Sequence, residues 1–184
     1  EIYADKPPVG LLEAASAMGR DDYKNCVAFN SLSKRSNLPG LRSGYVCGDA
    51  AIMGKFLLYR TYHGSAMAAQ NQWLSAKAWQ EETHVIKNRD LYSMKYEAFL
   101  DVLKDVWPMQ RPAAGFYLWP ETPIEDLQFT IQLFTETNVK VVPGSYLARE
   151  VNGSNPGANR VRLALVAELD ECVEAANRIK RFLA

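Results

Sequence analysis

Apolar and polar positions in the first part of the chain follow first a helical and then an extended rhythm. Residues 10–18 carry apolar side chains at helical spacing, which predicts a short helix that ends at Gly19. Residues 26–29 form a short apolar run that is typical of a strand. Asp49 stands in front of another helical pattern, over residues 50–59, and has the side chain of an N-cap. The pattern of this region therefore predicts alternating helices and strand.

Two further helices are expected in the middle of the chain. Residues 66–79 repeat apolar side chains at helical spacing and follow Ser65, a candidate N-cap. From residue 81 to residue 106 the helical pattern continues for many turns and stops before Trp107. Because a helix of that length spans a distance comparable to a small domain, residues 81–106 are interpreted as a helix that connects two bodies.

A second unit is expected after this connecting helix. Residues 126–137 predict a helix with one apolar stripe, formed by Leu127, Ile131 and Phe134. Strands are expected over residues 115–120, 139–142 and 160–166, and a last amphipathic helix follows them. The elements together predict an α/β fold, with the edge of an α/β layer in residues 1–80, the connecting helix in 81–106 and a small C-terminal α/β domain in 107–184.

The charge balance narrows the classes of function. The 184 residues contain 21 basic and 21 acidic side chains, so there is no electrostatic argument for nucleic acid or for an anionic membrane surface. No apolar run reaches the length of a membrane span. Cys26, Cys47 and Cys172 are odd in number and show no metal-ligand spacing, which favours a reducing cytoplasm and no bound metal.

Candidate chemistry is concentrated in "SLSKRSNLPGLRSG", residues 31–44. Lys34, Arg35 and Arg42 lie within nine residues of one another, beside the hydroxyls of Ser31 and Ser33. Directed hydrogen bonds from a guanidinium and a hydroxyl suit a phosphate or a carboxylate, so this segment predicts an anion site. The alternative reading is a solvated turn in which the charges have no ligand.

The full string S-L-S-K-x4-P-G-x-R-x-G resembles the pyridoxal-phosphate lysine segment of the class I and II aminotransferases of fold type I. The resemblance implies that Lys34 is the catalytic lysine, which holds the aldehyde of pyridoxal 5'-phosphate as a Schiff base. It further implies that Ser31 and Arg42 hold the cofactor phosphate and that Ser33 adds a hydroxyl there. Arg35 falls on no position that the family requires, and it is interpreted as structural or interfacial.

Substrate-binding residues are also implied by the resemblance. Members of the family carry an arginine on a strand of the small domain, which pairs with the substrate α-carboxylate, and Arg162 matches that position better than Arg160 does. The segment "YRTYHGSAM" resembles one that reaches towards the neighbouring subunit in family dimers, which makes Arg60, Tyr62 and His63 candidates for the distal carboxylate. The alternative for Arg60 is a basic side chain that stabilises a helix C-terminus.

Five strings together are similar to the succinyldiaminopimelate aminotransferases of proteobacteria: "SLSKRSNLPGLRSGYVCGDA", "YRTYHGSAM", "AGFYLWP", "VVPGSYLARE" and "NRVRLALVAELDECVEAANRI". This resemblance implies amino transfer between N-succinyl-diaminopimelate and 2-oxoglutarate in lysine and diaminopimelate biosynthesis. It also implies small amino acid and keto acid substrates, a homodimer in the cytoplasm, and no nucleic acid or membrane partner.

Family members are about twice as long as this chain, which resembles their C-terminal half. The aromatic residue that stacks on the cofactor ring and the aspartate that pairs with its nitrogen are therefore expected before Glu1. On that basis the 184 residues alone are expected to be inactive.

Other classes of protein remain open at this stage. One is a different fold type I pyridoxal-phosphate enzyme, either another aminotransferase or a C–S lyase. Another is a non-catalytic, aminotransferase-like sensor domain of a transcription regulator, which would keep Lys34 and Arg42. A third is a fragment with a purely structural or assembly role.

Overall fold

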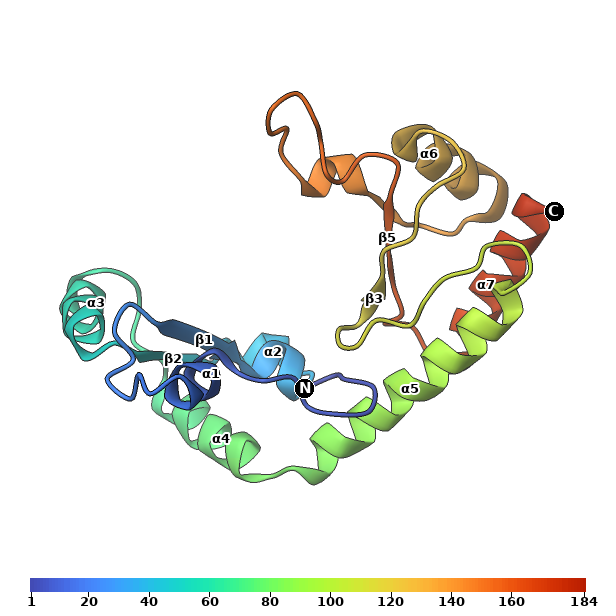
Figure 1. Ribbon diagram of the computed structural model, residues 1–184. Helices are drawn as coiled ribbons and strands as arrows, with labels where there is room; N and C mark the ends of the chain where they lie inside the picture. The colour runs from blue at the N-terminus through green and yellow to red at the C-terminus, as the bar shows by residue number, and fades with distance from the viewer. The chain divides into compact units, whose positions relative to one another are not determined.

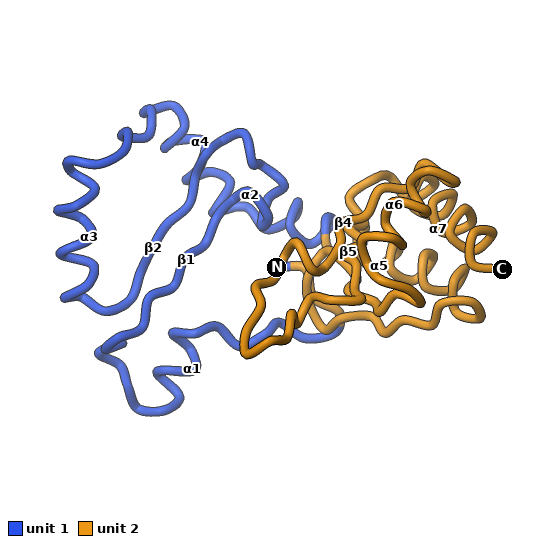
Figure 2. Tube along the Cα trace, turned by 90° about the horizontal axis from the view of Figure 1, so that it is seen from above, with its two compact units in different colours: residues 1, 5–88 blue, residues 2–4, 89–184 orange.

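The computed structural model describes all 184 residues (Figure 1). The chain divides into two compact units, one of Glu1 and Asp5–Asn88 and one of Ile2–Ala4 and Arg89–Ala184 (Figure 2). The division falls inside the longest helix, α5 (Thr83–Leu103). None of the helices combines the length and the apolar composition that crossing a membrane would require.

The first unit is built around two antiparallel strands, β1 (Val27–Ser31) and β2 (Gly44–Gly48). Between them lie a single helical turn, α2 (Leu32–Arg35), and a short 3-10 helix, η1 (Pro39–Leu41). The remaining helices of the unit are α1 (Leu11–Ala17), α3 (Ala50–Tyr62) and α4 (Ala69–Gln80).

The second unit contains a three-stranded antiparallel sheet in the order β3-β5-β4. Its strands are β3 (Tyr117–Leu118), β4 (Val142–Pro143) and β5 (Val161–Ala164). Helices α6 (Asp126–Thr137) and α7 (Leu169–Leu183) follow β3 and β5 in the chain, and η2 (Gly144–Leu147) follows β4. Strands and helices share one apolar core, made of Tyr96, Phe99, Leu103, Trp107, Leu118, Phe129, Leu133, Val141, Val161, Leu163, Leu165, Cys172, Ala176 and Ile179.

The predicted α/β class is confirmed, and several elements have the expected bounds. Helix α6 covers residues 126–137 as the apolar pattern indicates. Asp49 caps α3, because its Oδ1 accepts hydrogen bonds from the backbone N–H groups of Ala51 and Ile52 at 2.8 and 3.2 Å. The backbone N–H of Asn25, which donates to Oδ2 at 2.8 Å, contributes most to holding the pKa of the Asp49 carboxyl below its ordinary value, and the bonds from Ile52 and Ala51 lower it further.

Two sequence predictions are wrong and one strand was missed. Ser65 does not cap α4, which begins four residues later with Ala68 as its N-cap. The strand β2 was not predicted, although it supplies every partner of β1. The stripe of α6 is also misplaced: Ile131 and Phe134 are 57% and 50% exposed, whereas Phe129 and Leu133 are fully buried. The buried face is set by aromatic contacts of Phe129 with Trp107 and Phe182, residues distant in the chain.

Candidate functional site

Ser31 links the end of β1 to the single turn α2. It is the N-cap of that turn, since its Oγ accepts a hydrogen bond from the backbone N–H of Ser33 at 3.1 Å. The hydroxyl of Ser31 also lies 3.0 Å from that of Ser33. Leu32 is fully buried beneath the turn, whereas Lys34 is exposed on it. The burial of Leu32 therefore holds the turn in place, and the turn carries two hydroxyls and one amine.

The pairing of β1 with β2 brings the second part of the motif to the same end of the sheet. Ser31 is the register partner of Gly44, and its hydroxyl donates to the carbonyl oxygen of Ser43 at 3.1 Å. The backbone N–H of Leu32 donates to that same oxygen, also at 3.1 Å. A Cβ atom on Gly44 would lie 2.5 Å from the backbone oxygen of Asn30, so this close approach requires glycine. Arg42 is consequently held next to the segment that carries Lys34.

Arg42 occupies the left-handed region, with φ 51° and ψ 42°, where η1 ends. Its guanidinium is exposed, donates one hydrogen bond to the carbonyl of Pro39 at 2.7 Å, and forms no ion pair with a carboxylate. Residues 26–48, which span both strands, contain no Asp or Glu. Two hydroxyls, an ammonium and the guanidinium of Arg42 are a donor set that fits a phosphate dianion.

The third cation of the motif is arranged differently. Arg35 is 4% exposed and forms an ion pair with Glu82, and it donates to the backbone carbonyl of Ala78 at 2.8 Å. Its charge is therefore neutralised inside the first unit. The sequence interpretation left Arg35 without a partner, because Ala78 and Glu82 lie 43 and 47 residues away with no local signal that joins them.

In the second unit the two candidate arginines differ sharply in their contacts. Arg160 donates from Nη2 to the carboxylate of Glu121 at 2.5 Å and from Nη1 to the carbonyl of Trp119 at 3.1 Å. Arg162, in the middle strand β5, forms no ion pair, and its buried Nε has no hydrogen-bond partner. The guanidinium carbon lies 5.9 Å from the ring centroid of Tyr117. Only Arg162 of the two retains an unused buried donor for an anionic ligand.

Arg60 belongs to the last turn of α3. Its Nη1 donates to the carbonyl of His63 at 3.0 Å and its Nη2 to that of Ser65 at 3.2 Å, so the guanidinium closes the loop that follows the helix. Gly64 turns beneath it with φ 83°, where an added Cβ would collide with the guanidinium. Tyr62 is 79% exposed. These contacts are those of a residue at a helix C-terminus, the alternative that the sequence left open for Arg60.

The sequence and the fold of this chain are similar to those of known proteins. A family model described as aminotransferase class I and II matches residues 1–179. A crystal structure of an aminotransferase from Neisseria meningitidis is 46% identical and superposes with a TM-score of 0.95, covering 100% of this chain and 47% of that one. The 4-dedimethylamino-4-oxo-anhydrotetracycline transaminase of Streptomyces rimosus is 31% identical over 95% of this chain and 46% of its own length.

A further solved structure is also similar to this chain. It is a probable N-succinyldiaminopimelate aminotransferase from Thermus thermophilus, 28% identical, with a TM-score of 0.76 over 88% of this chain and 43% of that one. The chain thus spans slightly less than half the length of each of these three proteins.

Proposed function

Because this chain belongs to the class I and II aminotransferase family, we propose that it supplies the lysine and the anion-binding residues of an enzyme that exchanges an amino group between an amino acid and a 2-oxo acid. The family is pyridoxal-phosphate dependent. The observation that carries the proposal is the contact of Ser31 with Ser43, which joins the lysine segment to Arg42 in a stretch without acidic side chains.

The phosphate of the cofactor is assigned to Ser31, Ser33 and Arg42. When bound, pyridoxal phosphate supplies an aldehyde that bonds to amines and a ring that delocalises electrons. The two hydroxyls are 3.0 Å apart, so both can lie at one phosphate oxygen. Ser33 can donate to that oxygen directly, whereas Ser31, whose single O–H donates to the carbonyl of Ser43, can do so only by giving up that bond. Arg42 brings a planar guanidinium that can donate two parallel hydrogen bonds to phosphate oxygens, which gives both attraction and orientation.

Lys34 is assigned two tasks in turn. Its Nζ would hold the cofactor through the aldehyde that the cofactor supplies. As a free amine, it would take the proton from the substrate α-carbon and give it back during the exchange. The exposure of Lys34 on α2, above buried Leu32, is what such a mobile amine needs.

Arg162 is assigned to the substrate α-carboxylate. Its guanidinium has no carboxylate partner in the protein, and its buried Nε lacks an acceptor, which a carboxylate oxygen would provide. Arg160 is assigned a structural role because Glu121 and Trp119 already accept its N–H groups. Since every amino acid and 2-oxo acid substrate carries an α-carboxylate, Arg162 serves both halves of the exchange.

The amino donor is proposed to be N-succinyl-diaminopimelate, with 2-oxoglutarate as the acceptor. This assignment is supported by the resemblance of five strings of the sequence and by the Thermus thermophilus relative. Arg60 and Tyr62 are assigned to the distal carboxylate of this donor. Arg60 can bind it only by exchanging the carbonyls of His63 and Ser65 for the carboxylate. A homodimer in the cytoplasm and a place in lysine biosynthesis belong to the same proposal.

A second candidate is an aminotransferase of the same family with another amino donor. The Streptomyces rimosus relative is named for a substrate of quite different chemistry, although it is 31% identical to this chain. The residues assigned to the phosphate and to the α-carboxylate would have the same roles in such an enzyme. The two candidates therefore differ in the role that they give to Arg60 and Tyr62.

The test uses the full-length protein with pyridoxal phosphate and 2-oxoglutarate. Glutamate formation is measured with N-succinyl-diaminopimelate, with unmodified diaminopimelate and with aspartate as amino donors. The proposal expects kcat/KM to be at least tenfold higher for the succinylated donor. A higher kcat/KM for another donor would reject the substrate assignment alone, whereas no glutamate from any amino donor in a panel widened to all common amino acids would reject amino transfer to 2-oxoglutarate.

A further inference from the structure

Arg35 follows the candidate cofactor lysine directly, yet it is among the most buried charged residues of the chain, with 4% of its surface exposed. Its Nη1 donates to the carbonyl of Ala78 at 2.8 Å and to the hydroxyl of Ser36 at 3.2 Å. The guanidinium carbon lies 4.9 Å from the ring centroid of Trp79. The end of α4 thus contacts the guanidinium through the carbonyl of Ala78 and the ring of Trp79.

Two carboxylates complete its surroundings. Nη2 forms an ion pair with Glu82, and Nε lies 3.9 Å from a carboxylate oxygen of Glu1. Burying a guanidinium is costly unless its charge and its N–H groups are satisfied. Here a carboxylate, a carbonyl and an aromatic ring all converge on one side chain, so the position of Arg35 is fixed from several directions.

The segment that receives Arg35 is itself well anchored. Glu81 caps the start of α5, since its carboxylate accepts from the backbone N–H of Thr83 at 2.7 Å and of His84 at 3.2 Å. Glu82 is the next residue, between the end of α4 and the start of α5. The junction of the two helices therefore offers a rigid place for the guanidinium of Arg35.

The turn α2 needs such an anchor. It has only four residues, and a helix of one turn cannot hold its own orientation. Leu32 and Arg35 are three positions apart and lie on the buried side, whereas Lys34 is exposed. Fixing Leu32 and Arg35 therefore fixes the rotation of α2 and with it the direction in which Lys34 leaves the backbone.

We propose that Arg35 is the positioning residue of Lys34, and that it acts by holding α2 against the α4–α5 junction. The inference rests on the proposed function in one respect, the role of Lys34 as the lysine that bonds to the cofactor. A guanidinium with only a structural role would add stability to the first unit without affecting how fast Lys34 reacts.

The test measures how fast Lys34 bonds to added pyridoxal phosphate in the full-length, cofactor-stripped protein. The amine condenses with the aldehyde, so a carbon–nitrogen double bond replaces the carbon–oxygen double bond and one water is released. Borohydride then supplies hydride to this bond, and the stable secondary amine is quantified by mass spectrometry of the Lys34 peptide. The melting temperature of each cofactor-free variant is recorded beside the rate.

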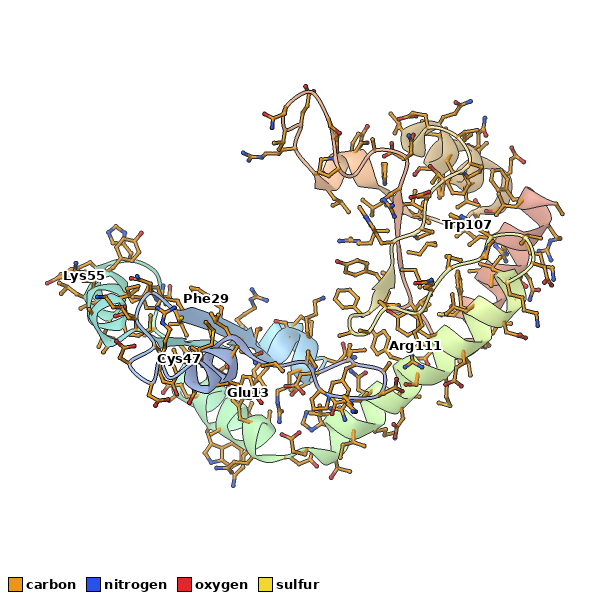
Figure 3. All side chains as sticks on the ribbon, in the orientation of Figure 1. Glu13, Phe29, Cys47, Lys55, Trp107 and Arg111 are labelled. Carbon is orange, nitrogen blue, oxygen red and sulfur yellow. The ribbon has the colours of Figure 1, made fainter.

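Arg35→Met keeps much of the apolar stem and removes the guanidinium. We expect it to slow the bonding of Lys34 at least about tenfold, because small misplacements of a reacting group cost one to two orders of magnitude in rate. Glu82→Gln removes only the charged partner, whose side chain is 61% exposed, and should slow the reaction about threefold. Arg111→Met is the matched control: this half-buried arginine of the second unit contacts Ser93, Glu97 and the ring of Tyr96 beside α5 (Figure 3).

The outcomes separate the two proposals. If Lys34 of the wild-type protein takes up no cofactor, the proposed function fails before this inference is reached. If Arg35→Met melts at a lower temperature but bonds to the cofactor at the wild-type rate, Arg35 is merely structural and the inference is overturned. It is also overturned if Arg111→Met slows Lys34 as much. Should Arg35→Met fail to fold, an unchanged rate in Glu82→Gln overturns it, and a slower rate supports it.

Discussion

The hydroxyl of Ser31 donates a hydrogen bond to the carbonyl oxygen of Ser43, 3.1 Å away, and this contact joins the segment of Lys34 to the segment of Arg42. It exists because β1 and β2 pair with Ser31 opposite Gly44. A shift of that register by one residue would turn the side chains of a strand to the other face of the sheet. The proposed phosphate site therefore depends on the pairing of two strands as much as on its own side chains.

Gly44→Ala should damage both the strand pairing and the phosphate site. The new Cβ would lie 2.5 Å from the backbone oxygen of Asn30, so the strands must separate, at a cost of about 1–3 kcal/mol. Urea unfolding and titration with pyridoxal phosphate would both register the change. Gly54→Ala is the control, because it has open space inside α3 and should stabilise the protein by up to about 1 kcal/mol. Equal stability of Gly44→Ala and wild type would contradict the prediction.

Lys34→Ala should abolish amino transfer in the full-length protein while pyridoxal phosphate still binds without a covalent bond. Ser31, Ser33 and Arg42 remain to hold the phosphate, but no amine is left to anchor the aldehyde or to move the α-proton. Borohydride reduction followed by peptide mapping checks the assignment in the wild-type protein. Label on any lysine other than Lys34 would show that the cofactor lysine has been misassigned.

Arg42→Ala should weaken the affinity for pyridoxal phosphate. A dianionic phosphate loses a charged donor, and hydrogen bonds to charged groups contribute about 1.5–3 kcal/mol, which corresponds to a roughly 10- to 150-fold rise in Kd. Equilibrium titration at two salt concentrations measures the effect. Because the guanidinium of Arg42 donates only to Pro39 within the protein, the melting temperature without cofactor should change little. An unchanged Kd would remove Arg42 from the phosphate site.

Arg162→Ala should leave the cofactor bound and raise the KM for amino donors and 2-oxo acids alike, since all share the α-carboxylate. The expected loss is about 1.5–3 kcal/mol of substrate binding. Arg160→Ala is the matched control: it breaks a partly exposed ion pair with Glu121, worth at most about 1 kcal/mol, and should leave KM unchanged. If instead Arg160→Ala raises KM and Arg162→Ala does not, the two assignments must be exchanged.

Local signals in the sequence predicted the elements that are defined by their own residues. Asp49 is a cap that its neighbours Ala51 and Ile52 satisfy, and α6 is bounded by its own pattern. The string around Lys34 likewise contains all its proposed phosphate ligands within twelve residues. For such features the physical causes lie within one or two turns of the chain.

The features that escaped prediction depend on distant contacts. β2 is a strand because it pairs with β1, and its glycine-flanked, short sequence gives little signal alone. Phe129 faces the core of the second unit because Trp107 and Phe182 lie there. Nothing near Arg35 indicates that Ala78 and Glu82 will receive its guanidinium. The preference for Arg162 over Arg160 gains physical support only once Glu121 is seen beside Arg160.

The N-terminus of α5 should respond to acid through Glu81. Hydrogen bonds from Thr83 and then His84 lower the pKa of Glu81 from its ordinary value of 4.5 to about 2. Since the folded-state pKa is the lower one, the ionised carboxylate stabilises the folded state. That contribution is fully present above pH 4.5 and is lost as the pH falls through about 2. Carboxyl titration by NMR should place the midpoint of Glu81 well below that of an unperturbed glutamate.

Glu81→Gln provides the matching stability measurement, because the amide carries no charge. Its single oxygen can accept one of the two backbone hydrogen bonds, which Oε1 and Oε2 of Glu81 accept from Thr83 and His84. The wild-type protein should melt above this variant at neutral pH, and the difference should shrink as the pH falls from 4.5 towards 2. A difference that stays constant over this range would mean that the charge of Glu81 does not stabilise the junction. The same variant also bears on Arg35, because its partner Glu82 is adjacent to Glu81. If the loss of the Glu81 charge loosens the junction, Lys34 should bond to the cofactor more slowly in Glu81→Gln than in the wild-type protein, with both rates measured at neutral pH.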